Sequence, residues 1–528
     1  MTRIFEQRIN RLAAASQPDI LSGGLKGIEK ESLRVRPDGR LSDRPHPESL
    51  GSALTNRFVT TDFSEALLEF VTPSYPSTWE ALRFLCDIHQ FSYDVLGDEL
   101  LWATSMPCRI PEDPDIPIAY YGESNVGRMK TIYRNGLAYR YGRTMQTIAG
   151  VHFNYSLPMK FWPVYHEVEK SRAAEDEFRS EAYLALVRNF RRFGWLALYL
   201  FGASPAVCKS FGRAGVTGMP TLDGETYYEP FGTSLRMSDL GYSNRTQARL
   251  QISLNNLDDY IADLTRAMTT PEPIYEEIGL GKGSEYRQLS VNQLQIENEY
   301  YSPIRPKRVA YSGERPTAAL RRGGIEYVEV RSLDLNLFDP AGINQNAMRF
   351  MEAFLVYCLL QESPPLDKER MQEAAMNHTA TAKRGRDPAL ELARDGKAIA
   401  FSDWATEIVQ GVRRVAELID RAGGQDAYTR VADSQLQLVR NSGLTPSARL
   451  HAELQDANTS FFEFAMECAI EHKRYFADLV PLPKARQEEF AAEAADSMRR
   501  QRDIEAADSI SLQEYLDRWF ASDVRTVQ

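Results

Sequence analysis

The 528-residue sequence has few cysteines and no long apolar run. Its five cysteines are widely spaced and form no CxxC pair, which is typical of free thiols in a reducing compartment and argues against zinc or dithiol redox chemistry. The most apolar uncharged run, residues 193–208, contains glycines and a proline and is too short to span a bilayer. The cysteines are Cys86, Cys108, Cys208, Cys358 and Cys468.

Several common motifs are also missing. There is no GxxxxGK[ST], and the glycine cluster at 279–284 lacks that spacing, so the sequence offers no P-loop for a nucleotide. The zinc motif HExxH and the nucleophile elbow GxSxG are absent. The N-terminal residues 1–16 mix charged and apolar residues like an amphipathic helix, not like a signal peptide. We therefore expect a cytoplasmic protein.

The charge balance restricts the partners. Lys and Arg number 62 against 73 Asp and Glu, a net charge of −11. This acidity disfavours binding to nucleic acid or to an anionic membrane. Hydrophobic residues make up 43% of the chain, which is ordinary for a packed globular enzyme. An acidic protein that handles an anionic substrate must gather its cations locally.

Strand-like and helical patterns alternate in the first two thirds, and helical patterns dominate the rest. Apolar residues at spacings of three and four predict helices over 401–423 and 458–480, whereas prolines and a basic run indicate a loop or connector at 364–395. The pattern predicts an α+β protein with one main sheet, a core at 1–360 that contains the strand-like segments, and a mostly helical part at 361–528 packed on it. Strands are expected at 27–35, 57–63, 65–73, 150–158, 234–242 and 325–336.

Acidic side chains lie inside several of these strand-like segments. Alternate residues of a strand share a face, so Glu29 and Glu31 point the same way, although a solvated edge explains that pair equally well. Glu69 lies in the apolar run ALLEFV, where an unpaired carboxylate is too costly. A lone strand histidine such as His152 is more often structural. Together, the acidic groups and the imidazole are economically explained by a hard cation such as Mg²⁺. The set is Glu29, Glu31, Asp62, Glu69, His152 and Glu329.

Cations accompany these carboxylates. Arg236 and Arg331, in strand-like segments, need a carboxylate or an anion, whereas the basic segment 303–308 is equally well explained as a surface loop. Cations beside a carboxylate–metal cluster are what a phosphoryl-transfer site uses against the charge of a nucleotide. A non-catalytic Mg²⁺ or nucleotide-binding protein and a metal-dependent hydrolase remain as alternatives.

A family resemblance is carried by long segments that occur in a fixed order over roughly residues 20–350. They are GIEKESLRV, HPESLGSALTNRFVTTDFSEALLEFVTP, GVHFNYSLP, YLFGASPAVC, SLRMSDLGY, LQIENEYYSPIRPKR and GGIEYVEVRSLDLN. These segments closely resemble bacterial glutamate–cysteine ligases of the gamma-proteobacterial type. Long ordered matches are far more specific than a short motif, and beyond about residue 360 only the helical context continues.

The resemblance implies a glutamine-synthetase-like fold, with a curved, mainly antiparallel sheet and helices outside it. It implies that ATP, L-glutamate and L-cysteine give γ-glutamylcysteine, ADP and phosphate through a γ-glutamyl phosphate, the first step of glutathione biosynthesis. Mg²⁺, with Mn²⁺ as an alternative, would be bound by the acidic set and His152. The resemblance assigns Lys307 and Arg331 to catalysis and, with Arg305, to the ATP phosphates. It assigns the amino-acid pockets to Tyr133, Arg134, Gln146, Arg236, Tyr242 and Tyr301.

The resemblance leaves the amine acceptor as the point to test, because a related carboxylate–amine ligase with another acceptor would share these motifs. The partners of the protein are expected to be small molecules only: L-glutamate, L-cysteine and ATP, with glutathione as a feedback ligand. A monomer or weak oligomer is expected.

Overall fold

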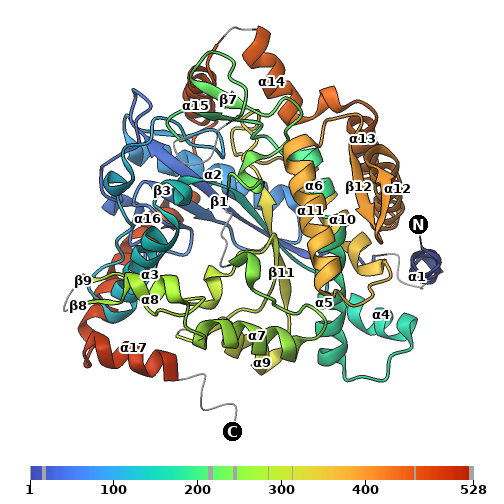
Figure 1. Cartoon of the computed structure of the whole chain (residues 1–528), viewed down its shortest axis with the longest axis horizontal. Coiled ribbons are helices and arrows are strands. Elements are labelled where there is room, and N and C mark those ends of the chain that lie inside the picture. Colours follow the sequence, from blue (N-terminus) through green and yellow to red (C-terminus); the bar gives the residue numbers. More distant parts are fainter. Residues whose placement is uncertain are drawn as a thin grey trace.

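One antiparallel sheet crosses the middle of the molecule in the computed structural model (Figure 1). Its strands are β1 (Leu25–Val35), β2 (Val59–Thr61), β3 (Leu67–Val71), β4 (Leu100–Leu101), β5 (Val151–Ser156), β10 (Ile304–Lys307) and β11 (Tyr327–Leu333). They follow the order β10-β11-β5-β1-β3-β2, and β4 pairs with the end of β1. The structure describes residues 2–14, 19–211, 218–241, 247–282, 285–311, 313–456 and 459–521.

The two faces of this sheet differ in chemistry because successive side chains of a strand point to opposite sides. Ile28, Phe153 and Val330 lie on one face and are buried in the main apolar core. Glu29 and His152 oppose each other on the other face. The alternation that predicted these strands therefore also separates the core side of the sheet from its polar side.

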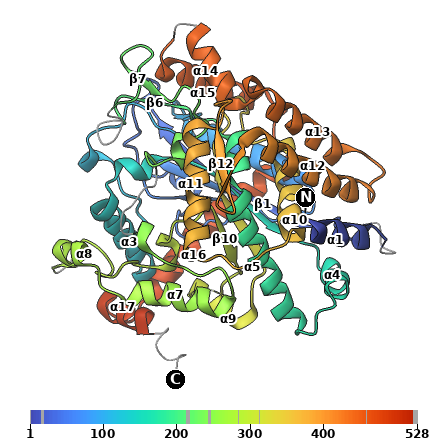
Figure 2. The ribbon, with the colours of Figure 1, turned by 45° about the vertical axis from the view of Figure 1, so that its right-hand side comes forward.

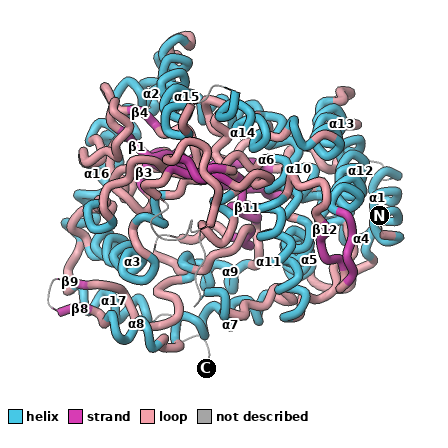
Figure 3. The backbone as a smooth tube through the Cα atoms, turned by 45° about the horizontal axis from the view of Figure 1, so that its top comes forward, coloured by secondary structure: helices cyan, strands magenta, loops and turns pink. Residues whose placement is uncertain are grey.

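Helices surround the sheet (Figures 1 and 2), and Figure 3 shows them enclosing the strands on several sides. They are α1 (Arg3–Ala14), α2 (Thr78–Leu96), α3 (Asn125–Tyr141), α4 (Phe161–Glu169), α5 (Glu175–Phe193), α6 (Trp195–Phe201), α7 (Leu257–Thr269), α8 (Pro273–Ile278), α9 (Pro316–Gly323), α10 (Gln345–Leu360), α11 (Lys368–Arg384), α12 (Phe401–Asp420), α13 (Ala427–Arg440), α14 (Pro446–Asp456), α15 (Phe461–Asp478), α16 (Lys484–Ala507) and α17 (Leu512–Ala521). The predicted α+β class, with an antiparallel sheet and outer helices, is confirmed.

The mostly helical last third is also as predicted. The helix expected at 401–423 is α12, which ends just before the glycine pair, and the helix expected at 458–480 is α15, which begins with a capping box at Ser460 and Glu463. The expected boundary at residue 360 coincides with the end of α10. Trp404 and Phe476 nevertheless belong to the same apolar core as the sheet, so the division into two parts stays a prediction.

The prediction of a loop or connector at 364–395 is wrong for most of that segment. Asp367 accepts a hydrogen bond from Arg370 N and caps α11. Lys383 and Arg384 of the basic run fall in the last turn of that helix, where cations are favourable. The end of the segment 364–395 forms β12, the first strand of one of the described two-stranded hairpins. These are β6 (Ala206–Cys208) with β7 (Thr226–Tyr228), β8 (Gly281–Lys282) with β9 (Glu285–Tyr286), and β12 (Glu391–Arg394) with β13 (Lys397–Ala400).

The strand predicted at 234–242 is wrong as well. Its described residues form a 3₁₀ turn at Leu235–Met237. Ser234 Oγ donates to Asp334 Oδ1 at 2.9 Å, and Ser238 Oγ donates to Leu235 O at 2.7 Å. Serine hydroxyls that hydrogen-bond locally favour turns over an extended ladder, which explains the difference.

The basic segment at 303–308 forms the edge strand β10 and is not a surface loop. An edge position tolerates Pro306, whose nitrogen cannot donate to a ladder. Arg305 pairs in register with Glu329 of β11 and is 8% exposed. This pairing carries the cations of the segment to the polar face of the sheet.

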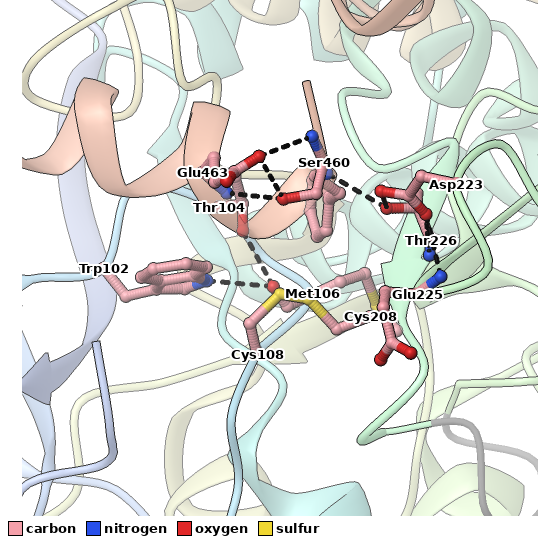
Figure 4. The surroundings of a disulfide bond; sticks show 11 residues. Trp102, Thr104, Met106, Cys108, Cys208, Asp223, Glu225, Thr226, Ser460 and Glu463 are labelled. Atoms are coloured by element: carbon pink, nitrogen blue, oxygen red, sulfur yellow. Dashed lines mark hydrogen bonds between the residues drawn. A yellow bond between two sulfur atoms is a disulfide. The ribbon is translucent and has the colours of Figure 1, made fainter. Parts of the chain in front are cut away.

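The prediction that all five cysteines are free is wrong for two of them. Cys108 and Cys208 form a disulfide (Figure 4), whereas Cys86, Cys358 and Cys468 are free. The bond joins the loop after β4 to β6 across a sequence separation of 100 residues. Only the tertiary fold brings their Cα atoms to 5.3 Å, so spacing along the chain gave no sign of it. None of the described helices has the length and apolarity to cross a bilayer.

Candidate active site

A cavity of about 590 Å³ opens over the polar face of the sheet. Its walls come from the strands, from α3 and from 3₁₀ turns at Thr144–Thr147 and Glu297–Glu299. A space of this size accommodates small-molecule ligands. Tyr242, a predicted pocket residue, lies outside the described residues. The other predicted residues all line the cavity: Glu29, Glu31, Asp62, Glu69, Tyr133, Arg134, Gln146, His152, Arg236, Tyr301, Arg305, Lys307, Glu329 and Arg331.

Strand pairing assembles the floor of the cavity from segments that are far apart in sequence. Glu29 lies opposite His152 across β1 and β5, and Glu31 lies opposite Glu69 across β1 and β3. Glu329 of β11 lies opposite Asn154 of β5, which is two residues after His152 and therefore on the same face. The carboxylates and the imidazole therefore share one surface.

His152 lies at the centre of this floor. Its Nδ1 is 3.0 Å from Glu29 Oε2 and 3.5 Å from Glu329 Oε1, and its Nε2 is 3.5 Å from Glu31 Oε1. One ligand atom from each of Glu29, His152 and Glu329 lies within 4.8 Å of the others. Carboxylate oxygens with an imidazole nitrogen form a donor set that suits a divalent cation.

Carboxylates are crowded at the end of the floor near β3, although Arg134 and Lys130 lie near Glu69. Removal from water, together with the nearby Asp62 carboxylate, raises the pKa of Glu31. Removal from water and the carboxylates of Glu29, Asp62 and Glu31 raise the pKa of Glu69 well above its ordinary value. Positive charge bound at this end would favour the ionised forms, so the electrostatics also fit a cation.

The opposite end, at β10 and β11, is rich in cations. Lys307 Nζ is 3.1 Å from Glu329 Oε2, and Arg331 Nη1 donates to Glu329 Oε1 at 2.7 Å. Although removal from water opposes ionisation, Lys307 and Arg331 hold the pKa of Glu329 well below its ordinary value. Arg331 Nε is buried and makes no hydrogen bond to the described residues. The guanidinium thus keeps donor capacity for an anionic ligand.

Arg236 reaches the cavity from the 3₁₀ turn and is 2% exposed. Its Nη2 donates to Arg331 O at 2.9 Å, and its Nη1 is 3.8 Å from Asp334 Oδ1. Asp334 is itself fixed by Ser204 and Ser234 hydroxyls at 2.6 and 2.9 Å. Asp334 is therefore the carboxylate that the sequence led us to expect beside Arg236.

Gly150 makes room for that guanidinium. A Cβ added at Gly150 would lie 2.0 Å from Arg236 Nη2 and 2.5 Å from its Cζ. Real side chains do not approach so closely, so any larger residue would displace the guanidinium. The glycine is therefore explained by close packing of the arginine against the start of β5.

Helix α3 and the turns opposite the sheet supply the remaining predicted residues. Arg134 donates through Nε to the backbone oxygen of Asp62, and its guanidinium lies 4.5 Å from the centre of the Tyr121 ring. Tyr301 OH lies 3.2 Å from Met237 Sδ, while Tyr133 and Gln146 face the cavity. These side chains give one wall aromatic surface and a cation.

Sequence reasoning missed several residues of that wall. Arg140 and Glu299 line the cavity as a fully buried ion pair at 2.9 Å, and Tyr141 OH donates to the same carboxylate at 2.5 Å. Lys130 also lines the cavity, one helical turn before Arg134, and removal from water together with that arginine lowers its pKa to about 8. The only available signal was the helical spacing of Lys130 and Arg134, which a solvated helix face shows as well.

The family model for glutamate–cysteine ligase matches residues 9–381 of the chain. A glutamate–cysteine ligase of Alcanivorax borkumensis is 47% identical over 521 residues, covering 98% of this chain and 99% of the relative. One from Pseudomonas putida is 48% identical over 505 residues, covering 96% of each chain.

Solved structures show the same likeness. A crystal structure of a Francisella tularensis glutamate–cysteine ligase in complex with AMP superposes with a TM-score of 0.90 at 36% identity, over 96% of this chain and 99% of that chain. A bifunctional glutathione synthetase of Pasteurella multocida has a TM-score of 0.71 at 22% identity, over 89% of this chain and 55% of that one. At that identity the second likeness concerns the fold alone.

Proposed function

We infer the function of this chain from its membership of the glutamate–cysteine ligase family, to which its full-length similarity assigns it. It ligates L-glutamate to L-cysteine with ATP and so performs the first step of glutathione biosynthesis. We also propose which residues do this and which ion they hold. The observation that carries it is the single cavity that joins a carboxylate floor, a cationic end and an aromatic, cationic wall.

A divalent cation, Mg²⁺ or alternatively Mn²⁺, fits the donor set of the floor. The residues that would hold it are Glu29, Glu31, Asp62, Glu69, His152 and Glu329. When bound, such an ion supplies positive charge to the phosphates of ATP. The raised pKa values of Glu31 and Glu69 support this assignment, because they mark a site with excess negative charge.

The cationic end would receive the phosphates of ATP. A carboxylate resists attack by an amine, and its conversion to an acyl phosphate removes that obstacle. Arg331 and Lys307 project from neighbouring strands and would contact the transferred phosphoryl group, with Arg305 behind them. A planar guanidinium with a free buried Nε offers two donors to phosphate oxygens.

The wall opposite the sheet would hold the amino acids. Arg134 and Arg236 can pair with substrate carboxylates, and Lys130 adds a third cation near Glu69. Tyr133, Gln146 and Tyr301 would enclose the cysteine, and the family resemblance adds Tyr242 as a pocket residue. The amine must approach the acyl phosphate in a fixed orientation, so positioning by this wall contributes to the rate as much as a general base would.

Location, assembly and feedback follow as proposals of the same kind. ATP and a free thiol substrate are both typical of the cytoplasm, where we place the protein, although the Cys108–Cys208 disulfide is unusual for a reducing compartment. Glutathione contains the γ-glutamylcysteine unit of the product, so it would compete for the amino-acid wall. We propose a monomer or weak oligomer, because side chains of one chain supply the carboxylate floor, the cationic end and the amino-acid wall of the cavity.

A coupled assay of ADP formation tests the function, with glutamate and cysteine each omitted in turn. We expect ADP only when both are present. Glutamate labelled with ¹⁸O in its γ-carboxylate should deliver one labelled oxygen to each phosphate released. Correct product with unlabelled phosphate would contradict the acyl-phosphate route and leave the product assignment intact.

A further inference from the structure

The C-terminal helix α17 packs against α3 (Figures 1 and 2), and α3 forms one wall of the cavity. Leu512 and Leu516 of α17 pack with Met129 and Ile132 of α3 and with Leu289 in a small apolar cluster separate from the main core. Met129 also lines the cavity. One layer of side chains therefore separates α17 from the substrate space.

Polar contacts fix α17 and the segment before it against α3. Asn125, at the first turn of α3, donates through its backbone N to Asp508 Oδ2 at 2.5 Å and through Nδ2 to Ile510 O at 3.0 Å. Asn125 is 4% exposed. Tyr286 OH donates to Gln513 Oε1 at 2.9 Å. The beginning of α3 is thus attached to the chain just before α17.

The C-terminal end of α17 is linked to a second part of the cavity wall, the Glu297–Glu299 turn. The Arg315 guanidinium lies 4.5 Å from the centre of the Trp519 ring, and Arg315 Nε donates to Glu297 Oε1 at 3.1 Å. Glu297 begins the 3₁₀ turn that contains Glu299, which lines the cavity. Helix α17 therefore connects α3 with the turn that faces it.

The apolar cluster that joins α3 to α17 is small compared with the main core behind the sheet. The floor strands are held by ladder hydrogen bonds and by the main core, whereas α3 meets α17 through a few apolar side chains. Close-packed side chains transmit displacements, because a void at one side lets the neighbour shift. Loss of Leu516 would therefore move Met129 and Tyr133 relative to the floor.

We propose that α17 is a positioning element of the active site, and that Leu516 and Trp519 set the affinity for the amino-acid substrates by fixing α3 and the Glu297–Glu299 turn. The proposal rests on the function inferred above, because α3 carries the amino-acid wall while the ATP phosphates would bind at β10 and β11. It assigns a catalytic contribution to the C-terminal helix without placing any of its residues in contact with substrate.

The test compares Leu516→Ala and Trp519→Ala with the wild type in the ADP assay. We expect KM for glutamate or cysteine to rise about tenfold in each variant, with KM for ATP and kcat changed less than twofold. Leu516→Met preserves volume and should restore the wild-type KM values. Thermal unfolding confirms that each variant folds, and if Leu516→Ala does not, Trp519→Ala decides the question.

The matched control is Leu436→Ala on α13. Leu436 is similarly buried but packs in the main core away from the cavity, so this variant should lose stability without a change in any KM. Unchanged amino-acid KM values in a folded Leu516→Ala or Trp519→Ala would overturn the proposal. An equal rise in the control would overturn it too. A wild type without amino-acid-dependent ADP formation would instead refute the function, so the two failures are distinguishable.

Discussion

The floor and the wall of the cavity are built in different ways. The floor consists of paired strands, in which Glu29, His152 and Glu329 are held by the ladder and by the core behind the sheet. The wall consists of α3, which rests partly on a small cluster with α17. The floor therefore resists displacement and suits charge stabilisation, which needs preorganised groups. The wall is the part whose position decides substrate affinity.

The largest effect is expected at the floor. Glu329→Gln keeps the shape of the side chain but removes the charge that pairs with Lys307 and Arg331. We expect kcat to fall roughly 100-fold to 1,000-fold, with the fold intact by circular dichroism. Glu326→Gln, an exposed change three residues earlier, is the control and should be neutral. A tenfold loss or less at saturating Mg²⁺ would remove Glu329 from the reaction.

A smaller effect is expected where floor and wall meet. Gly150→Ala places a methyl group where the Arg236 guanidinium lies, so the arginine must move. We expect KM for an amino-acid substrate to rise about tenfold while kcat falls less. Gly423→Ala meets nothing within 4 Å and should leave all parameters unchanged. Normal kinetics in Gly150→Ala would show that Arg236 does not bind substrate.

The charge of the floor has a measurable effect on stability when no metal is bound. The pKa of Glu69 is raised in the folded chain, so its contribution to stability is full below the unfolded pKa of about 4 and is lost as pH rises through the folded value. When a chelator has removed divalent cations, Glu69→Gln should therefore raise Tm by about 2 °C at pH 8 and have no effect near pH 4.

Calorimetry with and without Mg²⁺ checks this prediction. Mg²⁺ should raise the Tm of the wild type at pH 8, because a ligand that binds only the folded state stabilises it. The same addition should affect Glu69→Gln less. An identical Mg²⁺ response in the two proteins would exclude Glu69 as a ligand.

The smallest effect on turnover is expected at the disulfide. Neither Cys108 nor Cys208 lines the cavity, and both are buried beside α15 (Figure 4). Reduction of the bond, or Cys208→Ser, should change kcat and every KM less than twofold while lowering Tm. A large kinetic change would mean that the loop after β4 helps to hold the floor residues in place, and that the sheet and the core do not suffice.

Much of the floor could be predicted from the sequence, and much less of the wall. Glu69 within ALLEFV and Glu329 within YVEVRSL are visible as charges in apolar strands. Tyr133 and Gln146 came from the resemblance alone. Arg140 and Glu299 are separated by 159 positions, and no local pattern marks them as partners. The strand predicted around Arg236 is a turn, because serine hydroxyls there bond to Asp334 and to the local backbone.

The sequence by itself determined which face each strand residue occupies, since alternation of side chains follows from local backbone geometry. It also determined the family, through the order of its long segments. Only the tertiary structure decided that Glu31 meets Glu69, that Cys108 meets Cys208 and that α17 supports α3. Those contacts join residues far apart in the chain, and they are selected by burial of apolar surface over the whole molecule, which no local pattern records.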